Sequence, residues 1–460
     1  MKIFKEESAL SAFSDTGMMF SALSILAVGV ILSLRTRFVQ VRKLNKAFKY
    51  LFLPEDGDGQ ISGFGALCTS LSATIGTGNI IGVATAVKLG GAGALFWMAV
   101  AGFFGMATKY AEGMLAVKYR VKNPDGTVSG GPFYYIERGI CPRYSRKFGI
   151  LARLFAFFCM SAGLLGIGTL TQSNGIADAV DRITDSRVLF NLCGRQITLS
   201  AAVVSVTVTV CAMLIIKGGT KSIARASEII VPFMSAAYVL LMLFVIAVNY
   251  RNLPSAFSQI IKGAFTLRSA GGAASGVGFC AAIKYGVTRG VFSNEAGLGS
   301  AAIAAAQARS GDSVRQGLVT MTGTFIDTLV ICMMTGLAVI CTSSANGSAE
   351  GFNITANALL SLPFSYRVCE ILLCVCLIFF SFTTVVGWNF YSEKCFEYLC
   401  GGETRLMPVF RLVYMAAVAA GPFLNTAAAW GIADVCNLLA VFPNLIALVI
   451  LTGKKFSSGE

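Results

Sequence analysis

The chain contains no histidine among its 460 residues. Histidine is the usual general base of a catalytic triad, a common metal ligand and the side chain that most readily changes charge near neutral pH. Its absence excludes a histidine-based triad, a histidine metal site and a histidine proton relay.

Charged residues are also scarce. Asp, Glu, Lys and Arg make up 13% of the chain, whereas a soluble globular protein carries about 25%. Apolar residues make up 55%, and the mean hydropathy is +0.71. This composition excludes an ordinary soluble protein and predicts a protein that crosses the membrane several times.

Two further signals are missing. The 14 cysteines are scattered along apolar segments without paired spacing, which favours small buried apolar side chains over disulfides or metal ligands. Residues 1–15 lack a short apolar core followed by a small-residue cleavage site. The first apolar segment is therefore predicted to be a retained span and not a removed signal peptide.

What the sequence has instead is a series of long apolar segments. A helix needs about 20 residues to cross the hydrocarbon core of a bilayer. The eleven candidate spans are residues 17–34, 64–89, 92–117, 150–180, 197–216, 229–248, 273–306, 318–341, 368–391, 409–424 and 430–451. They predict an all-α polytopic membrane protein with a single transmembrane domain and no separate soluble domain.

The net charge of +14 is compatible with nucleic acid binding, but its distribution argues against it. Lys and Arg gather in alternate connections, namely 35–49, 118–147, 217–225, 309–315 and 394–411. Alternation of this kind is the positive-inside pattern of membrane proteins. We therefore expect a plasma membrane protein of bacterial or archaeal type, surrounded by membrane lipid, with its N-terminus outside and its C-terminus in the cytoplasm.

The second apolar segment is interrupted at its centre. Residues 72–79 read Ser-Ala-Thr-Ile-Gly-Thr-Gly-Asn, a poor helical sequence because glycine weakens helices and Ser, Thr and Asn compete for backbone hydrogen bonds. Irregular backbone at membrane depth persists only where it is buried in protein or lines a cavity. The interruption predicts a binding site near the midplane, as in secondary transporters.

The seventh apolar segment is interrupted in a similar way, with glycines spread from Gly276 to Gly299. Two interrupted spans at corresponding positions of two five-helix units are typical of inverted repeats. We expect the repeats to occupy residues 61–250 and 270–453, with residues 1–60 as a peripheral first helix and cytoplasmic loop. Close helix packing is the alternative explanation for a glycine-rich helix.

A broken helix exposes two kinds of polar group. Thr77, Gly78 and Asn79 lie at the start of the second half-helix, where free N–H groups and the positive end of the helix dipole suit a carboxylate. The last carbonyl groups of the first half suit a cation or an ammonium group. A zwitterionic amino acid needs both.

The ninth segment contains two adjacent threonines, Thr383 and Thr384, followed one turn later by Trp388. Threonines in membrane helices often bond to their own backbone carbonyls. The functional alternative is ligation of a hard cation such as Na⁺, which prefers oxygen donors. Trp388 fits either a pocket wall or an aromatic residue at the membrane interface.

Other polar residues lie inside apolar segments. Gln172 and Asn174 need hydrogen-bond partners in a membrane, so both packing between helices and a binding role remain open. Asp327 is a functional candidate or the partner of a basic residue. Arg289 and Glu295 flank the seventh-segment interruption, where an ion pair or a cytoplasmic gate is favoured over substrate contact.

Several motifs resemble those of the alanine or glycine:cation symporter family. They extend over most of the chain. The matching motifs are Gly76-Thr-Gly-Asn79, Gly82-Val-Ala-Thr85, Gly93-Ala-Leu-Phe-Trp97, Gly105-Met-Ala-Thr-Lys109, Ala116-Val-Lys-Tyr-Arg120, Phe292-Ser-Asn-Glu-Ala-Gly297, Phe325-Ile-Asp-Thr328, Phe382-Thr-Thr384, Gly387-Trp388, Ala433-Asp434 and Pro443-Asn-Leu-Ile-Ala447.

The resemblance implies the leucine-transporter-like fold of the amino acid–polyamine–cation superfamily, with one helix added at the N-terminus. It also implies a sodium site between the broken helix and the helix with the hydroxyl pair. The ligands implied for that sodium ion are the main-chain carbonyls of Ser72, Ile75 and Phe380 and the hydroxyls of Thr383 and Thr384.

The resemblance implies an amino-acid pocket beside the sodium ion. Asn79 matches a polar position close to both the cation and the substrate. The residues implied for the pocket are Thr77, Gly78, Asn79, Gln172, Asn174, Ile283 and Trp388.

The function implied is sodium-coupled import of small neutral amino acids, alanine or glycine, with Na⁺ as the coupling ion and no organic cofactor. Proton coupling through Asp327, a preference for glutamine and a non-transporting amino-acid sensor are the alternatives. An enzyme is not expected, because there is no histidine or metal motif and Asp327 has no evident catalytic partner in the sequence.

Overall fold

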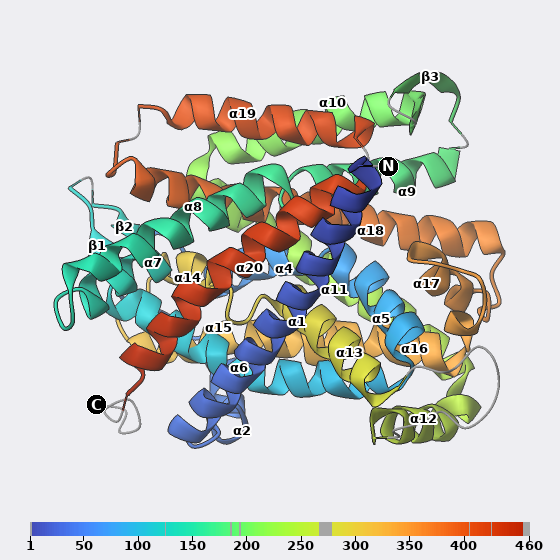
Figure 1. Ribbon diagram of the computed structural model, residues 1–460, viewed down its shortest axis with the longest axis horizontal. Helices are drawn as coiled ribbons and strands as arrows, with labels where there is room; N and C mark the ends of the chain where they lie inside the picture. The colour runs from blue at the N-terminus through green and yellow to red at the C-terminus, as the bar shows by residue number, and fades with distance from the viewer. Residues whose placement is uncertain are drawn as a thin grey trace.

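The computed structural model describes residues 2–124, 126–184, 186–192, 195–265, 278–403, 405–424 and 426–453, which are mostly helical (Figure 1). Residues 273–277 of the seventh predicted span lie outside the described residues, as do the side chains of Ala433 and Asp434 in the motif near the C-terminus.

The first part of the chain forms a long helix followed by a broken one. The elements are α1 (Lys2–Arg35), α2 (Val39–Arg42), α3 (Leu44–Tyr50), α4 (Gly63–Thr74), the π-helical turn η1 (Gly78–Gly82) and α5 (Val83–Gly90). The chain bends by 57° between α4 and the helix that follows. The interruption predicted in the second apolar segment is therefore present.

Four long helices, one of them in two pieces, and two small hairpins follow. The elements are α6 (Gly93–Lys118), β1 (Val121–Lys122), β2 (Val128–Ser129), α7 (Pro132–Tyr135), α8 (Gly149–Leu165), α9 (Leu170–Thr184), β3 (Val188–Leu192), β4 (Arg195–Thr198), α10 (Leu199–Lys217), α11 (Gly219–Val248) and α12 (Leu253–Phe265). Strand β1 pairs antiparallel with β2, and β3 pairs antiparallel with β4. Neither the hairpins nor the short helix α12 was predicted from the sequence.

The last part of the chain begins with a second broken helix. The elements are α13 (Phe279–Asn294), α14 (Ser300–Ala305), α15 (Ser313–Thr324), the π-helical turn η5 (Phe325–Cys332), α16 (Met333–Cys341), α17 (Phe352–Leu359), α18 (Tyr366–Leu399), α19 (Met407–Ala420) and α20 (Thr426–Leu451). The break between α13 and α14 falls at residues 295–299, inside the interrupted segment identified in the sequence.

The predicted apolar segments are helical, apart from the breaks, wherever the structure describes them. Within the described ranges, six helices are long and apolar enough to cross a membrane, and the bent α4–α5 pair makes a seventh if it is one span. The predicted count of eleven spans is not confirmed. The repeat boundaries at residues 61–250 and 270–453 remain a prediction.

The packing places both broken helices in the interior. Helix α6 packs against α13 and α15, while α18 packs against α4, α8 and α9. Helix α1 lies outside this group and packs on α6, α13 and α20, and in Figure 1 it runs diagonally between α20 and α13. The assignment of residues 1–60 as a peripheral addition remains a prediction.

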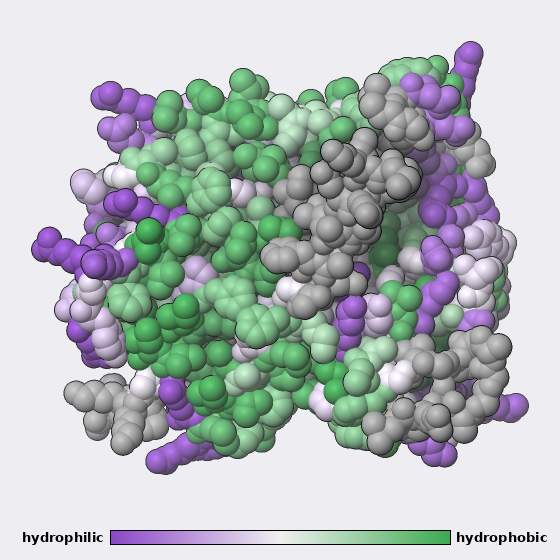
Figure 2. All heavy atoms as spheres, viewed as in Figure 1, coloured by the Kyte–Doolittle hydropathy of each residue, from purple (hydrophilic) through white to green (hydrophobic). Residues whose placement is uncertain are grey.

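The surface carries large exposed apolar side chains, including Leu214 on α10, Phe233 on α11 and Leu412 on α19, each about two-thirds exposed or more. Figure 2 shows hydrophobic residues across the middle of the molecule and hydrophilic residues at its left and right ends. Apolar surface on this scale needs an apolar environment. The chain is a multi-pass membrane protein.

Candidate binding site at two helix breaks

The first break is made by an asparagine that replaces a helical hydrogen bond. Ile75 has φ −77° and ψ 101°, which ends α4. The next amide, Gly76 N–H, donates to Asn79 Oδ1 at 2.9 Å. In an uninterrupted helix the same N–H would bond to the carbonyl of Ser72. The break therefore removes the usual donor from a carbonyl at the end of α4.

Helix α18 approaches the break closely. A Cβ atom at Gly76 would lie 2.9 Å from Thr384 Oγ1, so glycine allows this approach. Thr384 Oγ1 lies 3.3 Å from the carbonyl oxygen of Ile75 and 2.9 Å from that of Phe380. Thr383 Oγ1 donates to the same Phe380 oxygen at 3.0 Å. Backbone bonding by the two threonines, one of the sequence alternatives, is thus observed.

The structure therefore brings together four of the five residues expected at the sodium site. The fifth, Ser72, lies one turn earlier on α4, and its hydroxyl donates to Thr69 O at 2.8 Å. A Cβ atom at Gly387 of α18 would lie 2.7 Å from Ser72 Oγ, so Ser72 also faces α18. All five predicted residues lie at the α4–α18 contact.

Asp327 joins the two breaks. Its Oδ1 accepts a hydrogen bond from Asn79 Nδ2 at 2.7 Å, and its Oδ2 accepts from Ser293 Oγ and Thr328 Oγ1, each at 2.9 Å. Asp327 is 1% exposed. Its partners are neutral donors, and among the described residues no Lys or Arg forms an ion pair with it. The interpretation of Asp327 as the partner of a basic residue was therefore wrong.

The second break is held by a carboxylate from α6. Glu295, Gly297 and Gly299 all have positive φ, which ends α13 sharply. Gly297 N donates to Glu112 Oε1 at 3.0 Å, and Asn444 Nδ2 on α20 donates to the same oxygen at 2.8 Å. A buried acid on one helix thus stabilises the irregular backbone between two others.

Two buried charged residues near the breaks were given no role in the sequence analysis, although one of them ends a family motif. Lys109 and Glu112 lie on α6 and are 2% and 0% exposed. Lys109 Nζ makes no hydrogen bond within the described part of the chain. Charged residues three positions apart inside the third apolar segment were the available signal, because such residues share a helix face.

The expected ion pair between Arg289 and Glu295 is not present among the described residues. Glu295 is buried and accepts a hydrogen bond from Ser300 Oγ. Arg289 lines a larger cavity without Glu295, and the two residues share the lining of another cavity without an ion pair. The ion-pair interpretation was wrong, because the Glu295 carboxylate is bonded to Ser300 at the start of α14 instead.

A small cavity lies between the two breaks. Its volume is about 20 Å³, and its lining includes Thr77, Gly78, Gln172, Phe292 and Thr384. Gln172 is 3% exposed, and its Oε1 has no hydrogen-bond partner among the described residues. An unpartnered acceptor in a buried cavity is available to an incoming donor such as an ammonium group. We refer to this space as the central cavity.

A larger cavity of about 350 Å³ adjoins the central cavity, and Thr77, Gly78 and Phe292 line both. Asn174 lines this larger cavity, but its Nδ2 donates to the carbonyls of Gly421 and Leu424 at 3.1 and 3.0 Å. The bonds of Asn174 to the α19–α20 connection match the packing role considered from the sequence.

Two predicted pocket residues lie outside the lining of these cavities. Trp388 is fully buried, and a Cβ atom at Gly168 would lie 2.5 Å from its Cβ. Ile283 packs against a small cluster that contains Ala22 of α1 and Ala101 of α6. The structure therefore places Trp388 behind the α8–α9 connection and does not bring Ile283 to either cavity.

The outer ends of the two broken helices meet on one face of the molecule. Gln60 N and Ile61 N donate to Gln307 O at 2.8 and 3.2 Å, and Arg309 N donates to Ile61 O at 2.8 Å. Residues 60–61 precede α4, and residues 307–309 follow α14. We call this pairing, together with Arg120, the latch.

Arg120 strengthens the latch from the end of α6. Its guanidinium donates to Ala308 O at 2.7 Å and to Ser310 O at 3.1 Å. An arginine side chain with several carbonyl partners fixes the course of the chain that supplies them.

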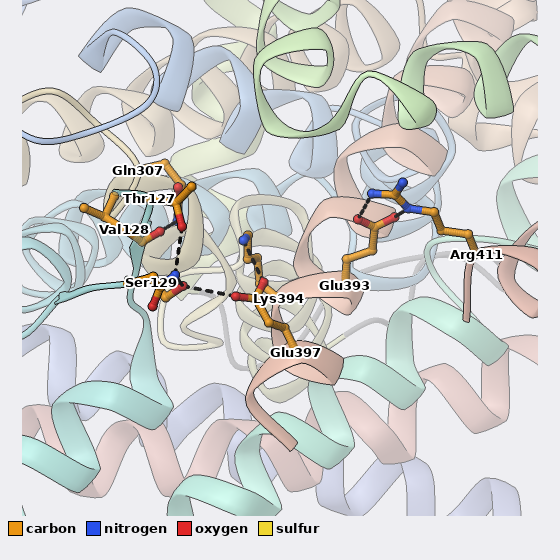
Figure 3. Close-up of polar contacts among 9 residues, drawn as sticks. Thr127, Val128, Ser129, Gln307, Glu393, Lys394, Glu397 and Arg411 are labelled. Carbon is orange, nitrogen blue, oxygen red and sulfur yellow. Dashed lines mark hydrogen bonds and ion pairs between the residues drawn. The ribbon is translucent and has the colours of Figure 1, made fainter. Parts of the chain in front are cut away.

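The β1–β2 hairpin extends the latch toward α18. Gln307 Nε2 donates to Val128 O at 2.8 Å, and Ser129 Oγ donates to Glu397 Oε1 at 3.3 Å (Figure 3). At its edge, Lys122 Nζ lies 2.6 Å from Asp58 Oδ2, and this hydrogen bond holds the pKa of the exposed Asp58 carboxyl below its usual value. The hairpin thus connects the segment after α14 with the helix that carries the threonine pair.

Comparison with known proteins gives a consistent result. The profile described as the sodium:alanine symporter family matches residues 6–458. The chain is 42% identical to the sodium/alanine symporter AgcS of Methanococcus maripaludis, over 94% of this chain and 92% of that protein. It is 35% identical to the putative sodium/proton-dependent alanine carrier protein YrbD of Bacillus subtilis, over 93% of this chain and 86% of that protein.

A solved structure shares the fold. The crystal structure of MhsT in complex with L-phenylalanine matches with a TM-score of 0.52 and 14% identity, covering 85% of this chain and 98% of that one. This match, together with the two broken helices packed in the interior, identifies the fold as leucine-transporter-like.

Proposed function

Because the chain belongs to the sodium:alanine symporter family, we propose that it is a sodium-coupled symporter that imports alanine, glycine or a similarly small neutral amino acid by alternating access. Proteins of this family are transporters and not enzymes, and amino-acid:cation symport is their shared activity. The identity of the amino acid and of the coupling ion is the part that we propose here.

The observation that carries the proposal is the position of Thr384 at the first break. Its hydroxyl oxygen lies 3.3 Å from Ile75 O and 2.9 Å from Phe380 O, so three oxygens from two helices converge. Hard cations such as Na⁺ prefer oxygen ligands. We propose that these oxygens bind sodium together with the Thr383 hydroxyl and the Ser72 carbonyl, whose usual helical donor bonds to Asn79.

The amino acid would lie in the central cavity. The N–H groups at Thr77 and Gly78 begin the second half of the broken helix and suit the substrate carboxylate. The unpartnered Gln172 Oε1 suits the ammonium group. Asn79 acts indirectly in this proposal, since its side chain is committed to Gly76, Ser293 and Asp327. The volume of about 20 Å³ is too small for a whole amino acid, so the cavity must widen on binding, and we propose that it widens only enough for a short side chain.

Coupling follows from this shared backbone. A cation at Ile75 O would order residues 75–78, which also supply the N–H groups for the carboxylate. Sodium would therefore raise the affinity for the amino acid, and the amino acid would raise the affinity for sodium by the same factor. With the proposed orientation, the latch lies on the cytoplasmic side and the larger cavity opens toward the outside.

The test is uptake of labelled L-alanine into proteoliposomes that contain the purified protein, with an inward Na⁺ gradient or with K⁺ in its place. We expect accumulation with Na⁺ alone, and competition by glycine and serine. Equal accumulation with K⁺ would contradict the proposal that sodium is the coupling ion. Binding without accumulation under either ion would indicate a sensor.

Proton coupling is the second candidate, favoured by the position of Asp327. The buried carboxylate bonds to side chains from both breaks, so a change in its protonation would alter the whole site. The name of YrbD, a relative at 35% identity, also mentions protons. Uptake driven by a pH gradient in the absence of sodium would favour this candidate.

A further inference from the structure

The structure contains a third cavity that the proposed function does not use. We propose that Ile167 is a specificity wall: it separates the central cavity from an apolar side cavity under α1 and so limits the length of the substrate side chain. This inference rests on the proposed function, because it assigns the substrate side chain to one end of the central cavity.

The two cavities share a wall. The side cavity has a volume of about 90 Å³ and lies between α1, α13 and α20, with Ala22, Ile25 and Leu438 in its lining. Ile167 lines both the side cavity and the central cavity, as do Phe292 and Glu295. Ile167 supplies a branched aliphatic side chain to this wall and is 6% exposed.

The backbone of Ile167 is held firmly. It lies in the interruption between α8 and α9, where Gly168 O accepts a hydrogen bond from Tyr414 Oη at 2.9 Å and Thr169 Oγ1 donates to Leu164 O at 2.8 Å. A Cβ atom at Gly168 would lie 2.5 Å from Trp388 Cβ. The wall therefore has no free space behind its backbone, and the β-branched side chain has few alternative rotamers.

Cavity size makes the wall selective. A volume of about 20 Å³ is close to what one water molecule needs, so the central cavity is nearly closed in this conformation and must widen to admit an amino acid, with Ile167 fixed at one end. The side cavity could hold several more carbon atoms. Its lining includes Lys284, Arg289 and Glu295, but α1 and α20 contribute the apolar Ala22, Ile25 and Leu438, which suit methylene groups. Replacing Ile167 by alanine would join the two spaces without touching the carboxylate, ammonium or sodium groups of the proposed site.

The experiment measures inhibition of sodium-driven L-alanine uptake by glycine, 2-aminobutyrate, norvaline and leucine. For Ile167→Ala we expect the half-inhibitory concentrations of norvaline and leucine to fall by about tenfold or more, since one methylene is worth roughly 10- to 200-fold in an apolar pocket. The value for glycine should change by less than about threefold. Ile167→Val removes one methyl group and should lower the half-inhibitory concentrations of norvaline and leucine by a smaller factor.

Ala22 on α1 provides the matched control, because it lines the side cavity and is absent from the shared wall. Ala22→Leu fills the side cavity. In the wild-type background it should leave inhibition unchanged, whereas in the Ile167→Ala background it should reverse the gain for norvaline and leucine. Reversal would distinguish entry into the side cavity from a general loosening of the site.

The outcomes separate the two proposals. Wild-type protein that does not accumulate alanine with Na⁺ contradicts the proposed function. In that case the role of Ile167 is tested by the thermal shift that the same amino acids cause in the purified variants. If Ile167→Ala and Ile167→Val both rank the four amino acids as the wild type does, by inhibition or by thermal shift, that result contradicts the proposal that Ile167 limits side-chain length. If Ile167→Ala does not fold, the valine variant alone decides.

Discussion

The amide nitrogen of Gly76 lies 2.9 Å from Oδ1 of Asn79, and this side chain takes the place of a helical carbonyl. The other end of the Asn79 side chain donates to Asp327 at 2.7 Å. One asparagine therefore terminates α4 and ties the break to the helix that contains η5. The break is maintained by specific bonds and not by glycine flexibility alone.

Replacing Asn79 should consequently damage both breaks. Asn79→Ala leaves the Gly76 amide and the Asp327 carboxylate each short of one partner, at a cost of about 1–3 kcal/mol per buried group. We expect alanine uptake to fall by more than about tenfold and the melting temperature of the purified protein to drop. Asn249→Ala, which removes an asparagine from the end of α11, is the control and should keep its uptake. Equal uptake in both variants would contradict this role of Asn79.

Thr384 offers a sharper test of the sodium site. Thr384→Ala removes the hydroxyl that faces Ile75 O and Phe380 O without leaving a buried charge. We expect the sodium concentration for half-maximal uptake to rise by about tenfold or more, while Thr384→Ser, which keeps the hydroxyl, stays near wild type.

The control for Thr384 is Thr342→Ala at the end of α16. Thr342 makes a similar backbone bond, to Ala338 O at 2.8 Å, and its hydroxyl also donates to Val339 O at 3.2 Å in the same helix end. Both alanine variants should remain folded by circular dichroism. Normal sodium activation of Thr384→Ala would show that the proposed sodium site is wrong.

Much of this architecture could be predicted because its signals are local. Glycine with Ser, Thr and Asn inside an apolar span indicated the break at residues 75–78, and the second break falls within the segment flagged for the same reason. The Thr383–Thr384 pair could be singled out because adjacent hydroxyls in an apolar helix are conspicuous. Local composition reports local backbone preference directly.

The partners across the fold could not be predicted in this way. The bond between Asn79 and Asp327 joins residues 248 positions apart, and periodicity carries no information about such pairs. Ile167 was not singled out, because an isoleucine in an apolar span normally indicates core packing. Ile283 was expected in the pocket from family resemblance, but its helix face turns toward α1.

Glu112 is predicted to stabilise the second break. Glu112→Ala removes the acceptor for Gly297 N–H and for Asn444 Nδ2, so we expect a lower melting temperature together with at least a tenfold loss of uptake. Glu112→Gln keeps a carbonyl acceptor in the same place and should recover part of the stability. If Glu112→Ala melts like wild type, the carboxylate does not hold the break.

The latch is predicted to keep its face of the molecule closed. Arg120→Ala removes the guanidinium that bonds to Ala308 O and Ser310 O, and the shorter side chain cannot replace it. We expect the population that is open on this face to increase. A cysteine introduced as Ala308→Cys reports the opening, because Ala308 is fully buried when the latch is closed.

The measurement is the labelling rate of that cysteine by a membrane-impermeant thiol reagent, read by mass spectrometry of its peptide in inside-out vesicles. Arg120→Ala should raise the labelling rate of the cysteine by about tenfold. Addition of sodium and alanine should change the labelling rate both with Arg120 present and with Arg120→Ala. Lys122→Ala is the matched control, because the exposed Lys122–Asp58 pair contributes little to stability. Labelling at the same rate in the two variants would mean that Arg120 does not close this face, and that the main-chain pairing of Ile61 with residues 307–309 is sufficient alone.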